Sequence, residues 1–303
     1  MPGSGRAVEM PIGYLSTKRL LGIGPLSTVA ADRSPGEAWM SGTPGPEPDG
    51  RRVVLVTGGT RGVGAGIARA FLRTGAHVVV CARRPPDEPV TAAGWTARFH
   101  SADLREPAAV EEVFTWLAAE YGRLDVLVNN AGGTPHRPLD AADAARHVRV
   151  LELNLLVPLA VSLAARPLLR ARPGPAAAAI VMIGSVSGTR PSPGTAAYGA
   201  AKAGLANLAR TMAVEWAPDV RVNTLVLGMA DTPAARAHYG GEAGVAAVGR
   251  TVPAGRLAEP DEIGEAAVFL ASDRAAYISG AALLVHGGGE APAFLAAAQG
   301  GTA

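Results

Sequence analysis

The chain has 303 residues, of which 48% are hydrophobic and 18% are charged, and its formal net charge is +2. This length allows one large α/β domain or two small ones, and so small a net charge gives no reason to expect a nucleic acid or an anionic membrane as a partner. No run of about 18 uninterrupted apolar residues predicts a membrane span, and the single cysteine, Cys81, excludes an internal disulfide and favours the reducing cytoplasm.

Residues 1–50 are rich in Gly, Pro and Ser and show no sustained hydrophobic periodicity. This composition is typical of disorder, so we predict a disordered N-terminal extension. The run 20–31 faintly resembles a secretory signal, but a long leader precedes it and glycines and a proline interrupt it. A natural start at Met40 is an alternative. The folded domain is expected over residues 51–290, followed by a tail over 291–303.

The domain opens with the β-branched run 52–56, which is typical of a buried parallel strand. It leads into the turn Thr57-Gly58-Gly59-Thr60-Arg61-Gly62-Val63-Gly64, and a helical pattern follows over 67–72. Glycines between a strand and a helix let the backbone approach a pyrophosphate, and the helix N-terminus offers free amides. The spacing is G-x-x-x-G-x-G rather than the more familiar G-x-G-x-x-G, and a plain tight turn is the alternative.

The second predicted strand, 77–82, ends without an acidic residue and is followed by Arg83 and Arg84. In dinucleotide folds an acidic residue near this position binds the ribose 2′-hydroxyl of NAD, whereas an arginine accommodates the 2′-phosphate of NADP. Arg61 could add a contact, because a guanidinium donates two parallel hydrogen bonds to a phosphate. The pattern favours NADP over NAD. The alternative is that Arg83 and Arg84 are solvated loop residues.

Two further strands continue the alternation of strands and helices. Residues 99–104 predict a third strand ending at Asp103, whose carboxylate could accept a hydrogen bond from an adenine amine. A helix from Pro107 follows, and then the run 124–128 predicts a fourth strand that leads into Asn129-Asn130-Ala131-Gly132. This alternation predicts an α/β protein with a single doubly wound parallel sheet of the Rossmann type.

The most informative stretch runs from Ser185 to Lys202. Tyr198 and Lys202 are four residues apart, so their side chains share one face of a helix. The ammonium stabilises a phenolate, and acid–base work near neutral pH needs a tyrosine pKa lowered by about 3 units, or about 4 kcal/mol. Ser185 ends an apolar strand-like run, where α/β sheets bind ligands. Taken alone, such a Tyr–Lys pair is also an ordinary pair of neighbours on an exposed helix.

These motifs together resemble those of the short-chain dehydrogenase/reductase family over residues 51–290. The resemblance rests on Thr57-Gly58-x-x-x-Gly62-x-Gly64, Asn129-Asn130-Ala131-Gly132, Asn154, Ser185 and Tyr198-x-x-x-Lys202. Several signals in one order and spacing are far more specific than any one of them.

The resemblance implies catalytic roles for four residues. Tyr198 would exchange a proton with the substrate oxygen, Lys202 would lower the pKa of Tyr198 and hold the nicotinamide ribose, and Ser185 would orient the carbonyl. Asn154 would order a water chain leading to Lys202, although an asparagine in a helix can equally hydrogen-bond its own backbone. From the motifs and the resemblance, the predicted cofactor-binding residues are Gly58, Thr60, Arg61, Gly62, Val63, Arg83, Arg84, Asp103, Leu104, Asn129, Ala131, Gly132, Tyr198, Lys202, Gly228 and Thr232.

The remaining elements complete the expected domain. Residues 140–170 predict a long helix with kinks at Pro158 and Pro167, and in the family this helix often forms a dimer face, so a homodimer or homotetramer is expected. A strand over 221–226 leads to Leu227-Gly228, where the family usually has Pro-Gly. This departure affects the local loop path rather than the chemistry.

The Gly- and Ala-rich segment 233–257 would, by the resemblance, form a substrate lid. We interpret His238 within it, and His136 after the fourth strand, as ordinary surface histidines. No cluster of His, Cys, Asp or Glu has metal-ligand spacing, so no metal is expected.

The expected activity is NADP(H)-dependent hydride transfer between the nicotinamide and a carbonyl or secondary alcohol of a small organic substrate. A β-ketoacyl thioester, a polyketide or steroid-like ketone, and a sugar-like alcohol all remain open. A non-catalytic dinucleotide-binding regulator is the alternative, although such a protein would be expected to lose Ser185, Tyr198 or Lys202. An epimerase or dehydratase on the same fold would need a longer C-terminal part than the residues after Gly204 provide.

Overall fold

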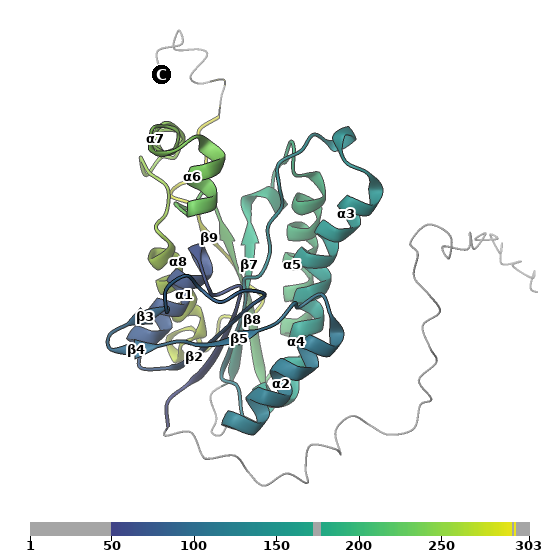
Figure 1. Cartoon of the computed structure of the whole chain (residues 1–303), viewed down its shortest axis with the longest axis vertical. Coiled ribbons are helices and arrows are strands. Elements are labelled where there is room, and N and C mark those ends of the chain that lie inside the picture. Colours follow the sequence, from purple (N-terminus) through teal and green to yellow (C-terminus); the bar gives the residue numbers. More distant parts are fainter. Residues whose placement is uncertain (1–49, 172–176, 293, 295–303) are drawn as a thin grey trace, which may run out of the picture. The chain divides into compact units, whose positions relative to one another are not determined.

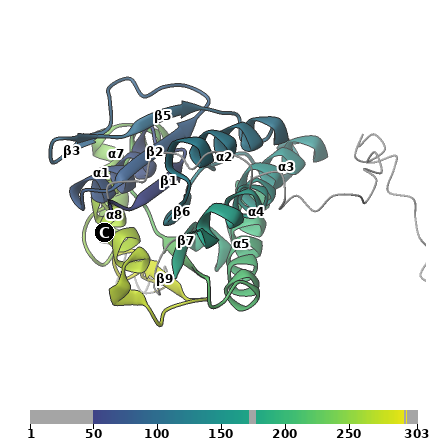
Figure 2. The same cartoon turned by 90° about the horizontal axis from the view of Figure 1, so that it is seen from below.

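The computed structural model describes residues 50–171, 177–292 and 294. The predicted disordered extension, apart from Gly50, and most of the predicted C-terminal tail lie outside these residues. Within the described part, a seven-stranded parallel sheet carries helices on both faces, as Figures 1 and 2 show. The predicted α/β class with a doubly wound Rossmann-type sheet is therefore confirmed.

The order of the strands places a ligand crevice at the centre of the sheet. The spatial order is β5-β2-β1-β6-β7-β8-β9, and all neighbours are parallel. The chain order reverses between β1 and β6, and ligands bind outside the carboxyl ends of the strands at such a reversal. The strands are β1 (Val53–Thr57), β2 (His77–Ala82), β5 (Arg98–Ser101), β6 (Val126–Asn129), β7 (Ala178–Ser185), β8 (Val220–Leu227) and β9 (Ala282–Val285).

Alternation along β1 explains why both faces of the sheet are covered. Val53 and Leu55 belong to the apolar cluster on one face, and Val54 and Val56 belong to the cluster on the other face. All four are fully buried, as expected for a central parallel strand. The first face is covered by α2 (Pro107–Tyr121), α4 (Val157–Arg170) and α5 (Ala196–Glu215), and the second by α1 (Gly62–Arg73) and α8 (Pro260–Ala271).

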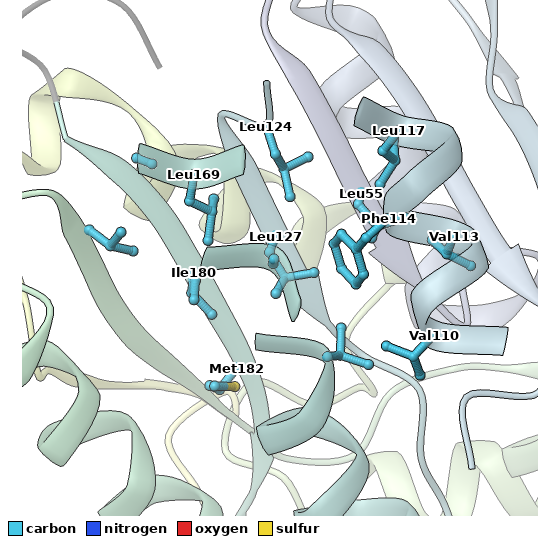
Figure 3. Close-up of a cluster of buried hydrophobic side chains, with 14 of the residues drawn as sticks. Leu55, Val110, Val113, Phe114, Leu117, Leu124, Leu127, Leu169, Ile180 and Met182 are labelled. Atoms are coloured by element: carbon cyan, nitrogen blue, oxygen red, sulfur yellow. The ribbon is translucent and has the colours of Figure 1, made fainter. Parts of the chain in front are cut away.

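Figure 3 shows the cluster on the first face. Leu55 and Leu127 from the sheet lie near Phe114 from α2, and Leu169 from α4 lies near Ile180. Burying each such side chain contributes about 1.5–3 kcal/mol relative to leaving it exposed. This packing holds α4 and α5 against the sheet and therefore fixes the helix that carries Tyr198.

The third strand and its surroundings differ from the sequence prediction. β5 ends at Ser101, two residues before Asp103. The chain turns here because the Asp103 side chain accepts a hydrogen bond from the Arg105 amide at 3.2 Å and the Asp103 carbonyl accepts one from Glu106 at 2.9 Å. The sequence also did not predict the short hairpin of β3 (Thr91–Ala92) and β4 (Trp95–Thr96) before β5.

The predicted long helix is interrupted differently from the expectation. A short turn, η2 (Leu139–Ala141), precedes α3 (Ala144–Leu151), and the π-helical turn η3 (Glu152–Leu156) separates α3 from α4. Pro158 has no N–H to donate to the carbonyl four residues earlier, which disfavours regular α-helix at that point. Pro167 lies inside α4 without ending it. A π turn inside a helix frequently marks a functional site, and this one contains Asn154.

One helical run within the described residues, Ala144–Arg170, is long and apolar enough to cross a membrane by length and composition, with a hydropathy of 1.7. Its inward side chains, such as Val161 and Ala165, belong to the cluster between the sheet and the helices. Core helices of soluble proteins pass the same test, so this run is weak evidence for a membrane.

The predicted lid segment forms two short helices after β8. These are α6 (Pro233–Tyr239) and α7 (Glu242–Gly249), and Figure 1 shows them next to each other above α8. A turn of glycines with positive φ, Gly287–Gly289, follows β9.

Candidate active site

The glycine-rich turn joins β1 to α1 at the crevice. Gly58 and Gly62 have φ values of +63° and +53°, which glycine adopts without strain. α1 begins at Gly62; Arg61 at its N-cap makes no side-chain capping bond, and the first turn holds no acidic residue. The amides of this helix N-terminus therefore remain available to an anion, and the turn fits a phosphate of a dinucleotide.

Two polar side chains hold this turn against the loop after β6. Thr57 Oγ1 accepts hydrogen bonds from the amides of Asn130 and Ala131 at 2.9 and 3.0 Å. Asn130 Nδ2 donates to the carbonyls of Thr57 and Gly58 at 2.9 and 3.1 Å. A Cβ at Gly64 would stand 2.2 Å from the Gly58 carbonyl oxygen, so the close approach requires glycine there. Sequence reasoning quoted Thr57 and Asn130 within motifs but assigned neither of them this positioning role.

The side chain of Asn129 is not available to a ligand. It is 3% exposed, and its Nδ2 donates to Ser162 Oγ at 2.9 Å and to Met182 Sδ at 3.3 Å. The amide thus joins β6 to α4 and β7 inside the core. The adjacent Ala131 does border the glycine turn, since a Cβ at Gly58 would lie 3.0 Å from the Ala131 Cα.

The three predicted phosphate-binding arginines lie at the surface. Arg83 and Arg84 follow β2 directly, Arg61 is in the glycine turn, and all three are exposed. None of them forms an ion pair within the described residues, whereas most arginines elsewhere in that part of the chain do. The prediction that they bind a 2′-phosphate stays open to test.

Asp103 has a partner that the sequence did not indicate. Its carboxylate binds the Arg105 guanidinium, with Nε–Oδ1 at 3.0 Å and Nη2–Oδ2 at 2.5 Å. These hydrogen bonds lower the pKa of Asp103 to about 2, and the charge of Arg83 contributes in the same direction. The carboxylate expected to accept from adenine is thus already engaged. Leu104, also predicted at the cofactor, is buried in the core.

The predicted catalytic residues meet where α5 passes the end of β7. Lys202 Nζ lies 5.5 Å from the centre of the Tyr198 ring, so the four-residue spacing places both side chains together as predicted. Lys202 is 4% exposed, and its Nζ donates to the Ile183 carbonyl at 2.8 Å. Ser185 is the last residue of β7 and hydrogen-bonds Tyr198. Its Oγ also accepts from the Ser187 amide at 3.1 Å.

Burial shifts the pKa values of both Lys202 and Tyr198. It lowers the pKa of Lys202 to about 8. It also raises the pKa of Tyr198, and the hydrogen bond with Ser185 acts in the opposite direction. Desolvation of the phenol dominates the pKa of Tyr198 in this structure, and the lowering of that pKa by Lys202 stays a prediction. Tyr198 is therefore held protonated near neutral pH, which suits it to donate a proton.

Asn154 fixes the loop after β6 beside Lys202. It is fully buried in η3, and its Nδ2 donates to the carbonyls of Gly133 and Val150 at 3.0 and 2.9 Å. Its Oδ1 accepts from the Gly133 amide at 2.8 Å. A Cβ at Gly132 would stand 2.6 Å from this Oδ1 and 3.5 Å from Lys202 Nζ. The local backbone bond considered from sequence is thus present, together with a loop contact; the water chain stays a prediction.

The loop after β8 closes the crevice from the other side. The Gly228 amide donates to the Val285 carbonyl at 3.0 Å, and a Cβ at Gly228 would stand 2.8 Å from the Cβ of His286. Thr232 caps α6 by accepting from the Ala235 amide at 3.1 Å. A Cβ at Gly62 would lie 3.4 Å from Thr232 Cγ2, so the start of α6 borders the glycine turn.

The structure brings two histidines together that the sequence left separate. The rings of His136 and His238 are centred 5.8 Å apart, and the Tyr239 ring is centred 5.0 Å from that of His238. A Cβ at Gly194 would stand 2.0 Å from His136 Nε2. The loop after β6, the loop before α5 and α6 therefore meet at these residues, and no local pattern in the sequence could have paired them.

Similarity to known proteins covers the same part of the chain. A family profile described as enoyl-(acyl carrier protein) reductase matches residues 58–290. The chain is 40% identical over 244 residues to cis-4-hydroxycyclohexanecarboxylate dehydrogenase from Sinomonas cyclohexanicum, which spans 78% of this chain and 96% of that protein. It is 37% identical over 242 residues to the 3-oxoacyl-[acyl-carrier-protein] reductase FabG from Escherichia coli, and this match covers 78% of this chain and 96% of that protein.

Solved structures agree with this match. The RhlG/NADP active-site complex from Pseudomonas aeruginosa superposes with a TM-score of 0.72 at 31% identity, over 78% of this chain and 95% of that one. The ligand-free aldohexose dehydrogenase from Thermoplasma acidophilum gives a TM-score of 0.72 at 29% identity, and the match covers 78% of this chain and 93% of that one.

Proposed function

Because the chain belongs to the short-chain dehydrogenase/reductase family, we propose that it is an NADP(H)-dependent oxidoreductase with Tyr198 as its acid–base residue. The proposed reaction moves a hydride between the nicotinamide and a carbonyl or secondary alcohol of a small organic substrate. One observation carries the proposal: Tyr198 lies with Ser185 and Lys202 at the sheet edge that also carries a glycine turn suited to a phosphate.

The proposed mechanism assigns each step on the protein side to a described contact. The bound nicotinamide supplies or accepts the hydride. In the reducing direction Tyr198 donates its proton to the substrate oxygen while Ser185 orients that oxygen by a hydrogen bond. The Lys202 ammonium stabilises the phenolate that is left, and its own position is fixed by the Ile183 carbonyl. Burial strengthens these interactions because it lowers the local dielectric.

The preference for NADP over NAD rests on charge at the end of β2. No acidic residue ends that strand, and Arg83 and Arg84 follow it without an ion pair in the described part of the chain. A guanidinium free of carboxylate partners is suited to a 2′-phosphate. The RhlG structure, a complex with NADP by its name, agrees with this preference.

The substrate class follows from the relatives' names as a proposal. One relative is a dehydrogenase of cis-4-hydroxycyclohexanecarboxylate and another is a 3-oxoacyl carrier-protein reductase. These names support hydroxy and oxo compounds, including a 3-oxoacyl thioester, as substrates of this chain.

We also propose a cytoplasmic homodimer or homotetramer. Large apolar side chains are exposed on neighbouring helices, with Leu156 53% and Leu163 55% exposed on the 144–170 run and Val214 79% exposed on α5. Burying such side chains against a second copy would remove apolar surface from water. Light scattering on the purified protein should give a mass of two or four chains, and a monomer would contradict the proposal.

The deciding experiment is NADPH oxidation by the purified protein against a panel of ketones, including a 3-oxoacyl thioester, with NADH run in parallel. Turnover with NADPH is expected, and the best ketone would identify the substrate class. Tight NADPH binding without turnover of any ketone, and without oxidation of the matching alcohols by NADP, would favour a non-catalytic regulator instead.

A further inference from the structure

A small hollow lies beside Tyr198, bounded by the loop after β6, by α3 and by the first turn of α5. Its cavity volume is about 20 Å³, and the residues that line it include Arg137, Arg146, His147 and Tyr198. A polar cavity of about 10–15 Å³ holds one water molecule, whereas pockets that take a whole small-molecule ligand have volumes of about 300–1,000 Å³. This hollow is therefore suited to a small polar end group of a substrate whose reacting carbon lies at Tyr198.

The part of the hollow that Arg137 and Arg146 line carries positive charge. Arg137 and Arg146 form no ion pair within the described residues, and none of the described residues that line the hollow is acidic. The acidic neighbour of α3, Asp143, is engaged as its N-cap, where it accepts from the Arg146 amide at 2.7 Å. Two other arginines near the crevice differ in being paired: Arg190 with Glu290, and Arg236 with Asp231.

The wall is also held in place. His147 Nε2 donates to the Leu139 carbonyl at 3.2 Å, which ties α3 to η2. The Arg137 amide donates to the Gly194 carbonyl at 2.8 Å, which ties the loop after β6 to the segment before Tyr198. The Arg146 side chain is half-buried, whereas Arg137 is exposed. A partly desolvated guanidinium, such as that of Arg146, binds an anion more strongly than a fully solvated one does, because less water must be displaced.

A second, larger hollow continues from the first. Its cavity volume is about 400 Å³, it shares Gly194 and Ala196 with the first, and its lining includes Leu139, Pro191 and Pro193. Such a lining is suited to hydrocarbon. The two hollows together would hold a molecule with an apolar body and one anionic end.

We propose that the substrate is an oxo or hydroxy carboxylate whose carboxylate binds Arg137 and Arg146 in the small hollow, beside His147. This inference rests on the proposed function, since it places the reacting carbon at Tyr198. A guanidinium binds a carboxylate through two parallel N–H···O bonds, and a carboxylate supplies the negative charge that this wall lacks.

The test compares keto acids with their neutral amides: 4-oxocyclohexanecarboxylate with 4-oxocyclohexanecarboxamide, and 4-oxopentanoate with its amide. NADPH-dependent kcat/KM is measured for the wild type, for Arg146→Gln and for Arg149→Gln. Arg149 is the matched control, because it lies on the same helix α3 but does not line the hollow.

The wild type should prefer each acid to its amide. Arg146→Gln should lower kcat/KM for the acids about 10- to 100-fold more than for the amides, mainly through KM, because it removes charged hydrogen bonds to the carboxylate. Arg149→Gln should leave kcat/KM for the acids and for the amides within about 3-fold of the wild-type values. Equal rates for acids and amides in the wild type, or an equal loss for both in Arg146→Gln, would overturn the proposal.

A binding measurement separates this inference from the proposed function. Cyclohexanecarboxylate, which has no oxo or hydroxyl group, is titrated calorimetrically into the protein saturated with NADP. Binding that Arg146→Gln weakens at least 10-fold supports the anionic subsite even if no ketone is turned over. Turnover of neutral ketones without such binding would leave the oxidoreductase proposal intact and reject the subsite. Stronger displacement by inorganic phosphate than by the carboxylate would reject a carboxylate as the natural group.

Discussion

The two ends of the crevice differ in what forms them: closely packed main chain at one end and side chains at the other. At the cofactor end, Thr57 and Asn130 hydrogen-bond main-chain atoms, and Gly64 allows two backbones to touch. At the proposed substrate end, the walls are side chains from segments far apart in the chain, such as Arg146 on α3 and Pro193 before α5. The cofactor end therefore depends on backbone geometry, whereas the substrate end depends on side-chain chemistry that can change without moving the backbone.

Tyr198 stands between the two ends, and its removal should have the largest effect. Tyr198→Phe deletes the proton that the substrate oxygen needs, so kcat should fall by about 1,000-fold or more. NADPH affinity, measured by fluorescence titration, should stay within about 3-fold, because the glycine turn is untouched.

The matched control is Tyr121→Phe, which removes a hydroxyl at the end of α2 that is bonded to Arg98 of β5, away from the crevice. It should keep normal turnover. Near-normal turnover by Tyr198→Phe would show that the proposed acid is wrong.

Gly64→Ala tests whether backbone geometry controls the cofactor end. Its Cβ would meet the Gly58 carbonyl oxygen at 2.2 Å and Asn130 Nδ2 at 2.5 Å, so the turn must shift. Such overpacking costs about 1–3 kcal/mol, and the loss should appear in NADPH affinity and in the free energy of unfolding.

Gly204→Ala on α5 is the control, since its Cβ would meet only the mobile end of the Leu155 side chain at 3.2–3.5 Å. Alanine also favours a helix interior. If both variants bind NADPH equally well, close backbone approach at the turn is not required.

Arg83→Ala tests a side-chain contact to the cofactor that is proposed at the end of β2. Loss of charge-assisted hydrogen bonds to a 2′-phosphate should weaken NADPH binding by about 10- to 30-fold, and NADH binding should change by less than about 3-fold.

Arg73→Ala is the comparison variant, because Arg73 is paired with Asp261 and Glu265 on α8. It should leave both affinities unchanged and cost at most about 1 kcal/mol of stability, as exposed ion pairs do. Equal weakening of NADPH and NADH by Arg83→Ala would reject its phosphate role.

The smallest effect concerns the buried ammonium. Burial lowers the pKa of Lys202 from 10.5 to about 8, so between these pH values the unfolded chain binds more protons than the folded one. The free energy of unfolding contributed by Lys202 should then rise with pH. Because the pKa of Tyr198 is raised in the folded chain, the phenol ionises first in the unfolded chain. This lowers the free energy of unfolding only above about pH 10.

Urea unfolding of dinucleotide-free protein at pH 8, 9 and 10 measures this effect against Lys202→Met. The difference in unfolding free energy between wild type and variant should grow in favour of the wild type by about 1 kcal/mol between pH 8 and 9, and by about 1 kcal/mol more between pH 9 and 10. A constant or shrinking difference would mean that Lys202 is not held in a desolvated site.

Sequence reasoning succeeded where the information was local. The strand–turn–helix around Gly58 and the spacing of Tyr198 and Lys202 involve neighbours along the chain, so backbone periodicity places them without knowledge of the fold. The alternation of strands and helices likewise predicted the doubly wound sheet, because short connections allow few other topologies.

The predictions that needed long-range partners were incomplete or wrong. Asn129 sits in a family motif, yet its amide is bonded to Ser162 in the core. β5 ends before Asp103, whose carboxylate pairs with Arg105. Burial among the surrounding elements raises the pKa of Tyr198, and the four-residue spacing to Lys202 could not indicate this.

The sequence by itself determined the class of fold, the phosphate-fitting turn and the pairing of Tyr198 with Lys202, because each follows from chain geometry over a few residues. Only the tertiary structure decided which side chains from distant segments meet, such as His136 with His238. It also decided how burial shifts the pKa values of Tyr198 and Lys202. The physical reason is that desolvation and contacts between distant segments depend on how the elements pack, which no local pattern records.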